Sequence, residues 1–105
     1  MLKGFSLVLV AVTMVGAAVA DEADVAAGEK IYQRVCKNCH GPKAQGMASY
    51  PRLSDKEADY LQQRLEQYRA GEKLGPNTPL MAPHAKKLSD EDIANIVTYI
   101  TTAFE

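Results

Sequence analysis

Two cysteines and a histidine stand side by side near the middle of this chain, in the segment Cys36-Lys37-Asn38-Cys39-His40. Cysteines three residues apart on a helical turn point to the same side, where both thiols can add to the vinyl groups of one porphyrin as thioethers. The adjoining imidazole can then bind the iron. The spacing therefore predicts a haem c attached covalently through Cys36 and Cys39, with His40 as one iron ligand.

The same cysteines allow three other interpretations. A thioredoxin-like redox pair needs a strand followed by a helix, and no strand pattern precedes Cys36. A zinc site needs a fourth ligand, and His84 is the only other histidine. A disulfide between Cys36 and Cys39 is conceivable in an exported protein, although so short a loop adds little stability.

The second axial ligand decides what the iron can do, and the candidates are Met47, Met81 and His84. Met47 follows His40 by only seven residues, which at about 3.4 Å per residue is barely enough chain to round the edge of a haem. Met81 lies 41 residues beyond His40, with a proline two residues away on either side. We expect Met81 to be the ligand. Met47 then serves in packing or at the surface, and His84 is the remaining alternative.

Ligation by nitrogen and sulfur leaves the iron no vacant position, and it raises the reduction potential relative to two histidines. One-electron transfer is the chemistry that remains, whereas gas sensing or peroxidase activity requires an open iron. The other ring N–H of His40 needs an acceptor, for which we expect the carbonyl of Pro51. Tyr50 and Arg52 are candidates to bind the haem carboxylates.

Length and composition restrict the chain to one small domain. It has 105 residues, 47 % of them hydrophobic and 24 % charged, with a formal net charge of −1. That balance argues against binding to nucleic acid. A domain this small usually needs a disulfide, a metal or a cofactor to complete its core, and a haem would fill that role.

The first twenty residues have the composition of a secretory signal. Lys3 precedes an apolar stretch, and Ala18-Val19-Ala20 fits a small-x-small cleavage site. We therefore expect residues 1–20 to be cleaved and residues 21–105 to form an exported, periplasmic monohaem domain without stable membrane insertion. The apolar stretch is shorter than the roughly 20 residues of a spanning helix, but a retained anchor is the alternative.

Periodicity predicts an all-α fold with about three main helices. The first covers about residues 24–36 and contains Gly28, which suggests close approach of another backbone. The second begins at a capping box formed by Ser54 and Glu57 and stops near Gly71. Prolines at 76, 79 and 83 predict an extended loop over 72–87. A capping box at Ser89 and Asp92 opens the last helix.

Taken together, these motifs resemble the small soluble bacterial c-type cytochromes with His/Met ligation, which are distant relatives of mitochondrial cytochrome c. The resemblance covers essentially all of residues 21–105, and its signature segments run from Gly28 to Tyr32, from Cys36 to Gly41, from Tyr50 to Leu53 and from Met81 to Ile93. It implies the cytochrome c fold. It also implies that Leu53 packs on the porphyrin and that Gly28 and Tyr32 meet Ile96 or Tyr99 where the first and last helices cross.

The resemblance implies an electron shuttle between periplasmic or membrane redox partners. Similar domains also serve as haem subunits of dehydrogenases, such as flavocytochrome c sulfide dehydrogenase or sulfite dehydrogenase, where a flavoprotein or molybdenum chain is the catalytic partner. A shuttle is normally steered by charges around its haem edge. We expect that role for four lysines: Lys37, Lys43, Lys86 and Lys87.

Overall fold

The computed structural model describes residues 4, 8–11 and 23–104, and its regular elements are helices. In chain order they are α1 (Val25–Ile31), the π-helical segment η1 (Tyr32–Cys36), α2 (Lys37–His40), α3 (Ala58–Arg69), α4 (Thr78–Ala85) and α5 (Asp90–Ala103). Within the described residues there is no strand, only an isolated bridge between Met47 and Tyr50. The predicted all-α class is confirmed. The predicted cleavage after Ala20 lies outside the described residues.

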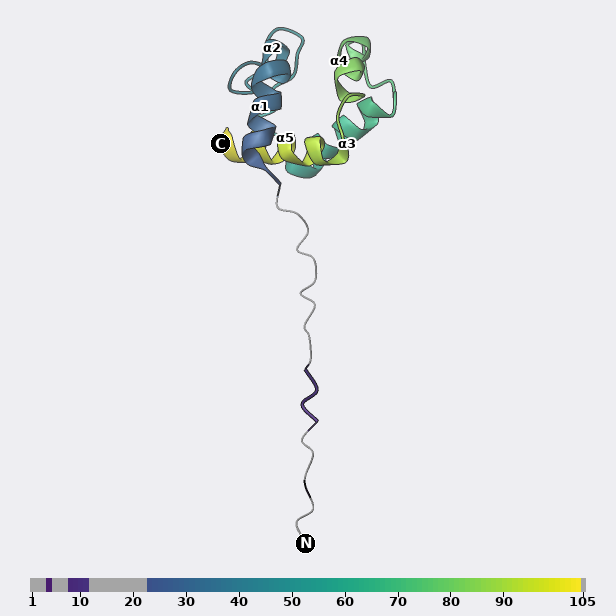
Figure 1. Ribbon diagram of the computed structural model, residues 1–105. Helices are drawn as coiled ribbons and strands as arrows, with labels where there is room; N and C mark the ends of the chain where they lie inside the picture. Colours follow the sequence, from purple (N-terminus) through teal and green to yellow (C-terminus); the bar gives the residue numbers. More distant parts are fainter. Residues whose placement is uncertain (1–3, 5–7, 12–22, 105) are drawn as a thin grey trace.

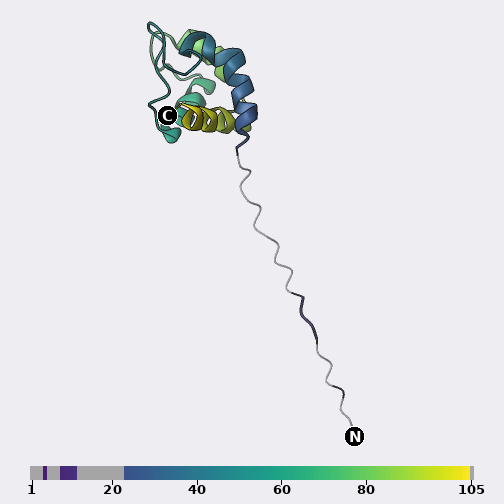
Figure 2. The ribbon, with the colours of Figure 1, turned by 90° about the vertical axis from the view of Figure 1, so that its left-hand side faces the viewer.

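The helices form a U around a central space. Helix α5 lies along the base, the continuous rod of α1, η1 and α2 rises from one end, and α3 and α4 stand at the other (Figure 1). The view turned by 90° shows the rod meeting α5 near its lower end (Figure 2). The two arms of the U therefore present α2 and α4 to opposite sides of the same space.

The first helical rod is longer than its sequence pattern predicts. Asp24 caps it by accepting a hydrogen bond from the backbone N–H of Ala27 at 3.0 Å. The rod continues beyond Cys36, where it was predicted to end, through α2 to His40. It stops because Gly41 adopts φ +89°, a left-handed conformation that suits glycine. The whole Cys-x-x-Cys-His segment is therefore helical.

Helices α1 and α5 cross in direct backbone contact at Gly28. A Cβ atom at this position would overlap the carbonyl oxygen of Asn95. The side chain of Asn95 also accepts a hydrogen bond from the Asp24 N–H at 2.7 Å. Beside the crossing, the rings of Tyr32 and Tyr99 pack with centroids 5.6 Å apart. The predicted close crossing is confirmed.

Helix α3 begins later than predicted, because the expected capping box at Ser54 does not form. The helix starts at Ala58, and Glu57 precedes it without a side-chain cap. Ser54 is instead held in the preceding loop, where its N–H donates to the carbonyl of Ala44 at 3.1 Å and its hydroxyl accepts from Arg52 Nε at 2.8 Å. These loop contacts compete successfully with the local capping pattern.

The segment predicted to be an extended loop contains a helix, so that prediction is wrong. Helix α4 includes Pro79 in its first turn and Pro83 in its interior. A proline in the first turn costs no hydrogen bond, because the N–H it lacks has no partner inside the helix. Pro83 removes one bond, from its own position to the carbonyl of Pro79. Two prolines are therefore compatible with this eight-residue helix, and Met81 lies on it.

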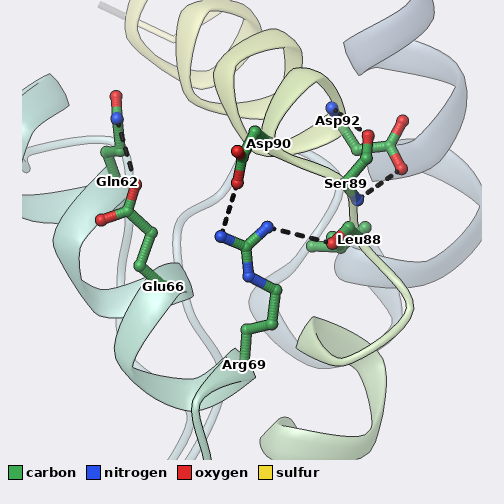
Figure 3. Close-up of polar contacts among 7 residues, drawn as sticks. All are labelled: Gln62, Glu66, Arg69, Leu88, Ser89, Asp90 and Asp92. Carbon is green, nitrogen blue, oxygen red and sulfur yellow. Dashed lines mark hydrogen bonds and ion pairs between the residues drawn. The ribbon is translucent and has the colours of Figure 1, made fainter.

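The corner between α4 and α5 is held by a cap and by an arginine from α3. Ser89 and Asp92 form the predicted capping box, with each side chain 3.0 Å from the other residue's backbone nitrogen. Arg69 donates to the Leu88 carbonyl at 3.2 Å and pairs with Asp90 at 2.6 Å (Figure 3). The figure also shows Gln62 donating to Glu66 one turn earlier on α3. The end of α3 is thereby joined to the start of α5.

In the part of the chain that the structure describes, no helix has the length and apolarity needed to cross a bilayer.

The crossing at Gly28 predicts a large cost for any side chain there. Gly28→Val must separate α1 from α5, and we expect it to lower the free energy of unfolding by about 3 kcal/mol. Urea unfolding followed by circular dichroism measures the change. Ala26→Val introduces the same residue at an exposed site of the same helix and should cost less than about 1 kcal/mol. Equal losses in the two variants would contradict the assigned crossing.

Candidate functional site

A cavity occupies the inside of the U, and most of its wall is apolar. Its apolar and aromatic lining comes from the rod, the following loop, α3, α4 and α5, through Val35, Tyr50, Pro51, Leu53, Tyr60, Leu61, Leu65, Tyr68, Leu74, Leu80, Ile96 and Ile100. Such a wall excludes water and suits a large apolar ligand. The chemistry-bearing residues Cys36, Cys39, His40 and Met81 line the same cavity.

One wall carries the two cysteines as free thiols. Both are half-buried on the helical rod and face the cavity. Burial raises the pKa of the Cys36 thiol to about 11, so that this thiol is protonated at neutral pH. Reactive redox cysteines have the opposite property, a lowered pKa. The environment of Cys36 therefore argues against the thioredoxin-like interpretation.

The imidazole of His40 is buried next to these cysteines, and one of its nitrogens is already engaged. Its Nδ1 lies 2.8 Å from the Pro51 carbonyl oxygen. A carbonyl can only accept, so Nδ1 carries the proton and Nε2 keeps its lone pair. The contact to Pro51 therefore leaves Nε2 as the nitrogen that is free to bind a metal.

The loop that delivers Pro51 is tied back to the end of the rod. Gly46 N–H donates to the His40 carbonyl at 2.7 Å, and Leu53 N–H donates to Ala44 at 2.9 Å. The hydroxyl of Tyr32 donates to the Gly41 carbonyl at 2.6 Å. Burial raises the pKa of that hydroxyl well above its ordinary value, so it remains a donor. The orientation of His40 is thus set by a network of neighbouring backbone groups.

Helix α4 brings Met81 to the cavity from the side opposite α2 (Figure 1). Its first turn is secured by buried Thr78, whose hydroxyl accepts from the N–H groups of Leu74 and Gly75 at 2.9 and 3.0 Å. The Asn77 amide donates to the hydroxyl of Ser49 at 3.1 Å. This last bond connects the start of α4 to the loop that follows His40.

The cations that line the cavity are not the four lysines predicted to lie around the haem edge. Lys37, Lys43, Lys86 and Lys87 are all exposed, but none of them lines the cavity. The cations that line it are Arg52, Lys56 and Arg64.

Lys56 and Arg64 flank the ring of Tyr60, at 5.9 and 5.2 Å from its centroid. With Tyr68, which also lines the cavity, these residues recur every four positions. That spacing places Tyr60, Arg64 and Tyr68 on one face of α3, and Lys56 lies just before the helix, which begins at Ala58. This four-residue spacing is the sequence pattern from which the basic and aromatic stripe could have been predicted. The stripe consists of Lys56, Tyr60, Arg64 and Tyr68, with Arg52 beside it at the cavity.

Of the residues predicted to surround a haem, Tyr50, Pro51, Arg52 and Leu53 all line the cavity. His84, the alternative ligand, lines it from the same helix as Met81. Met47 does not line it, and 43 % of its surface is exposed. The donor set therefore fits a haem: paired thiols and an imidazole on one wall, and a thioether on α4.

The helical fold and this donor set define a protein that carries a covalently bound haem. The sequence model of the cytochrome c family, described as "Cytochrome c", matches residues 25–104. The chain belongs to the cytochrome c family. It binds haem c and acts as an electron carrier, and Cys36, Cys39 and His40 have the Cys-x-x-Cys-His spacing of a haem c attachment site.

Several bacterial proteins are similar to the chain. It is 47 % identical over 81 residues to "Cytochrome c-554(548)" of Halomonas halodenitrificans, which covers 75 % of this chain and 95 % of that protein. It is 38 % identical over 92 residues to "Cytochrome c4" of Azotobacter vinelandii, covering 77 % of this chain and 44 % of that protein. The "Thiosulfate dehydrogenase electron acceptor" of Stutzerimonas stutzeri is 37 % identical over 82 residues, covering 69 % of this chain and 37 % of that protein.

The two hydrogen bonds that the Thr78 hydroxyl accepts predict that this hydroxyl stabilises the first turn of α4, the helix that carries Met81. Thr78→Val leaves the Leu74 and Gly75 N–H groups without an acceptor, and we expect it to lower the free energy of unfolding by about 1–3 kcal/mol. Thr78→Ser keeps the oxygen and should retain most of the stability. Denaturant unfolding of the haem-loaded proteins measures both. A valine variant as stable as the parent would show that these bonds contribute little.

Proposed function

We propose that this chain is a soluble one-electron shuttle whose iron is bound by His40 and Met81. The observation that carries the proposal is the arrangement of donors in one apolar cavity. His40 has its Nδ1 committed to Pro51, and Met81 stands on α4 across from it. Bound between an imidazole and a thioether, haem iron exchanges one electron without gaining or losing a ligand.

The protein's own residues keep the site in one geometry while the charge changes. The Pro51 carbonyl holds the imidazole in one tautomer and orientation. Asn77 ties the start of α4 to Ser49, and Arg69 ties its far end to α3. Apolar side chains form most of the cavity wall and so limit the access of water to the site. A site that changes little between oxidation states is what rapid electron exchange requires.

Among the candidates for the distal ligand, position and burial favour Met81. Met47 is at the surface and outside the cavity. His84 lines the cavity but is exposed, whereas Met81 is half-buried. A thioether in an apolar setting also stabilises ferrous iron, as a carrier of relatively high potential needs.

We also propose that the basic stripe on α3 and in the segment before it steers an acidic redox partner to the cavity. Arg52, Lys56 and Arg64 line it, and Tyr60 between the last two is 43 % exposed. The whole chain has a formal net charge of −1. A local positive cluster can orient an approaching anionic surface even on a protein whose net charge is slightly negative. Its effect on orientation is larger than its contribution to affinity.

A second candidate function is that of a fixed haem subunit of a dehydrogenase, with a flavoprotein or molybdenum chain as partner. The name of the similar Stutzerimonas stutzeri protein, an electron acceptor of thiosulfate dehydrogenase, supports a link to an oxidising enzyme. Co-purification at native expression level separates the two functions. A flavin or molybdenum spectrum in the same fraction favours the subunit, and a free monohaem protein favours the shuttle.

For the location, we propose that residues 1–20 are removed on export and that residues 21–105 work in the periplasm. The support is the composition of the first twenty residues, with Lys3 before an apolar stretch and Ala18-Val19-Ala20 at its end. Mass spectrometry of the protein purified from periplasm checks the new N-terminus at Asp21 and the mass of one covalently bound haem.

Removing the distal sulfur should lower the reduction potential. In Met81→Ala the iron loses the ligand that favours its ferrous state, so the midpoint potential should fall by on the order of 100 mV or more. Potentiometric titration followed by absorbance gives the value. Met47→Ala, which removes an exposed methionine outside the cavity, should keep the parent's midpoint. An unchanged midpoint in Met81→Ala would exclude Met81 as the ligand.

The basic stripe predicts the sign of the salt effect on electron transfer. Oxidation of the reduced protein by ferricyanide, a trianion, should slow as ionic strength rises, although the chain as a whole is slightly acidic. Arg64→Glu should reduce the low-salt rate several-fold and should accelerate oxidation by the trication tris(phenanthroline)cobalt(III). Lys30→Glu, at an exposed site of α1, should change both rates much less. Rates that rise with salt for ferricyanide would contradict steering by the stripe.

A further inference from the structure

Helix α4 presents two different iron-binding side chains to the cavity, one helical turn apart. Met81 and His84 both line it, and they are three residues apart on the same helix. In an α-helix such residues differ by about 60° around the axis and about 4.5 Å along it. The thioether and the imidazole therefore occupy neighbouring positions on the wall opposite α2.

The imidazole of His84 makes no side-chain hydrogen bond among the described residues, and His84 is exposed, whereas Met81 is half-buried. The paired lysines that follow it, Lys86 and Lys87, are exposed and do not line the cavity. His84 is thus the next nitrogen donor along α4 with access to the cavity.

The backbone around His84 is weaker than that of an ordinary helix. Pro83 has no N–H, so the carbonyl of Pro79 lacks its helical partner inside a helix of only eight residues. Beyond this gap, Lys86 N–H donates to the carbonyl of Ala82 and Leu88 N–H donates to that of Ala85, each at 3.0 Å. The missing bond makes the turn that carries His84 easier to deform than an uninterrupted helical turn.

We propose that His84 is a reserve ligand, which binds the iron when the sulfur of Met81 is lost. The proposal rests on Met81 being the normal ligand. The neutral imidazole donates its nitrogen lone pair to the vacated position, and no proton or electron is exchanged in that step. Since imidazole favours ferric iron relative to a thioether, the substituted site is a closed, low-potential site rather than an open one.

The different burial of the two donors and the short, proline-containing helix both fit this role of His84. The half-buried thioether is the inner donor and binds first, and the exposed imidazole is the outer donor and remains unused. The short, proline-containing helix allows one donor to replace the other without unfolding the corner that Arg69 holds at Leu88 and Asp90. A protein built this way keeps its iron protected from small ligands even when Met81 is damaged.

The test compares Met81→Ala, Met81→Ala/His84→Ala and Met81→Ala/Lys86→Ala as haem-loaded ferric proteins at pH 8. Electron paramagnetic resonance and absorbance report the spin state, and titration with free imidazole reports whether the position is open. Circular dichroism checks that each variant is folded.

We expect low-spin iron in Met81→Ala and in the Lys86 control, and high-spin iron in the His84 double variant. Free imidazole should bind the double variant at least about tenfold more tightly, because it no longer competes with His84. Equal spin state and equal imidazole affinity in Met81→Ala and the His84 double variant would overturn the inference while leaving Met81 as the ligand. Loss of the low-spin signal on removing Lys86 instead of His84 would also overturn it. If Met81→Ala keeps the parent's spectrum and midpoint, both the inference and the proposed ligation are wrong.

Discussion

The hydrogen bond between His40 Nδ1 and the Pro51 carbonyl is the contact on which the site depends. It fixes the tautomer of the only buried histidine of the described chain and leaves Nε2 with its lone pair inside the cavity. The loop that supplies the carbonyl is itself held by Gly46 and Leu53, which bond back to His40 and Ala44. One side of the haem site is thus determined by short-range contacts within a segment of some fifteen residues, at a scale where loop closure costs little entropy.

The other side of the site is built differently. Helix α4 is short and contains two prolines, so its own hydrogen bonds cannot determine where Met81 lies. Its ends are tied to other parts of the chain, by Asn77 to Ser49 and by the corner at Leu88 and Asp90 to Arg69. The ion pair of Arg69 is partly exposed and adds little stability by itself. Its role is geometric, because it joins α3, α4 and α5 at one point.

The sequence patterns were most reliable where a local rule had no tertiary competitor. Ser89 and Asp92 cap α5 as predicted, and Gly28 marks the crossing with α5, since a side chain there would overlap Asn95. The equally good capping pattern at Ser54 failed because the loop hydrogen bonds of Ala44 and Arg52 hold Ser54 elsewhere. The prolines of α4 were misleading because their effect depends on their position in the helical turn. The π-helical turn at Tyr32–Cys36 has no signal in the residue pattern at all.

By itself the sequence indicated the chemistry: a thiol pair and an imidazole at helical spacing predict covalent haem, and the helical periodicity predicts an all-α domain. Those properties depend on residue types and on separations of a few positions, so they can be predicted from local backbone geometry. Only the tertiary structure decided which cations line the cavity and that the helix carrying Met81 and His84 lies across the cavity from the helix carrying His40. These depend on contacts between segments far apart in the chain, whose relative placement is set by packing and not by any local pattern.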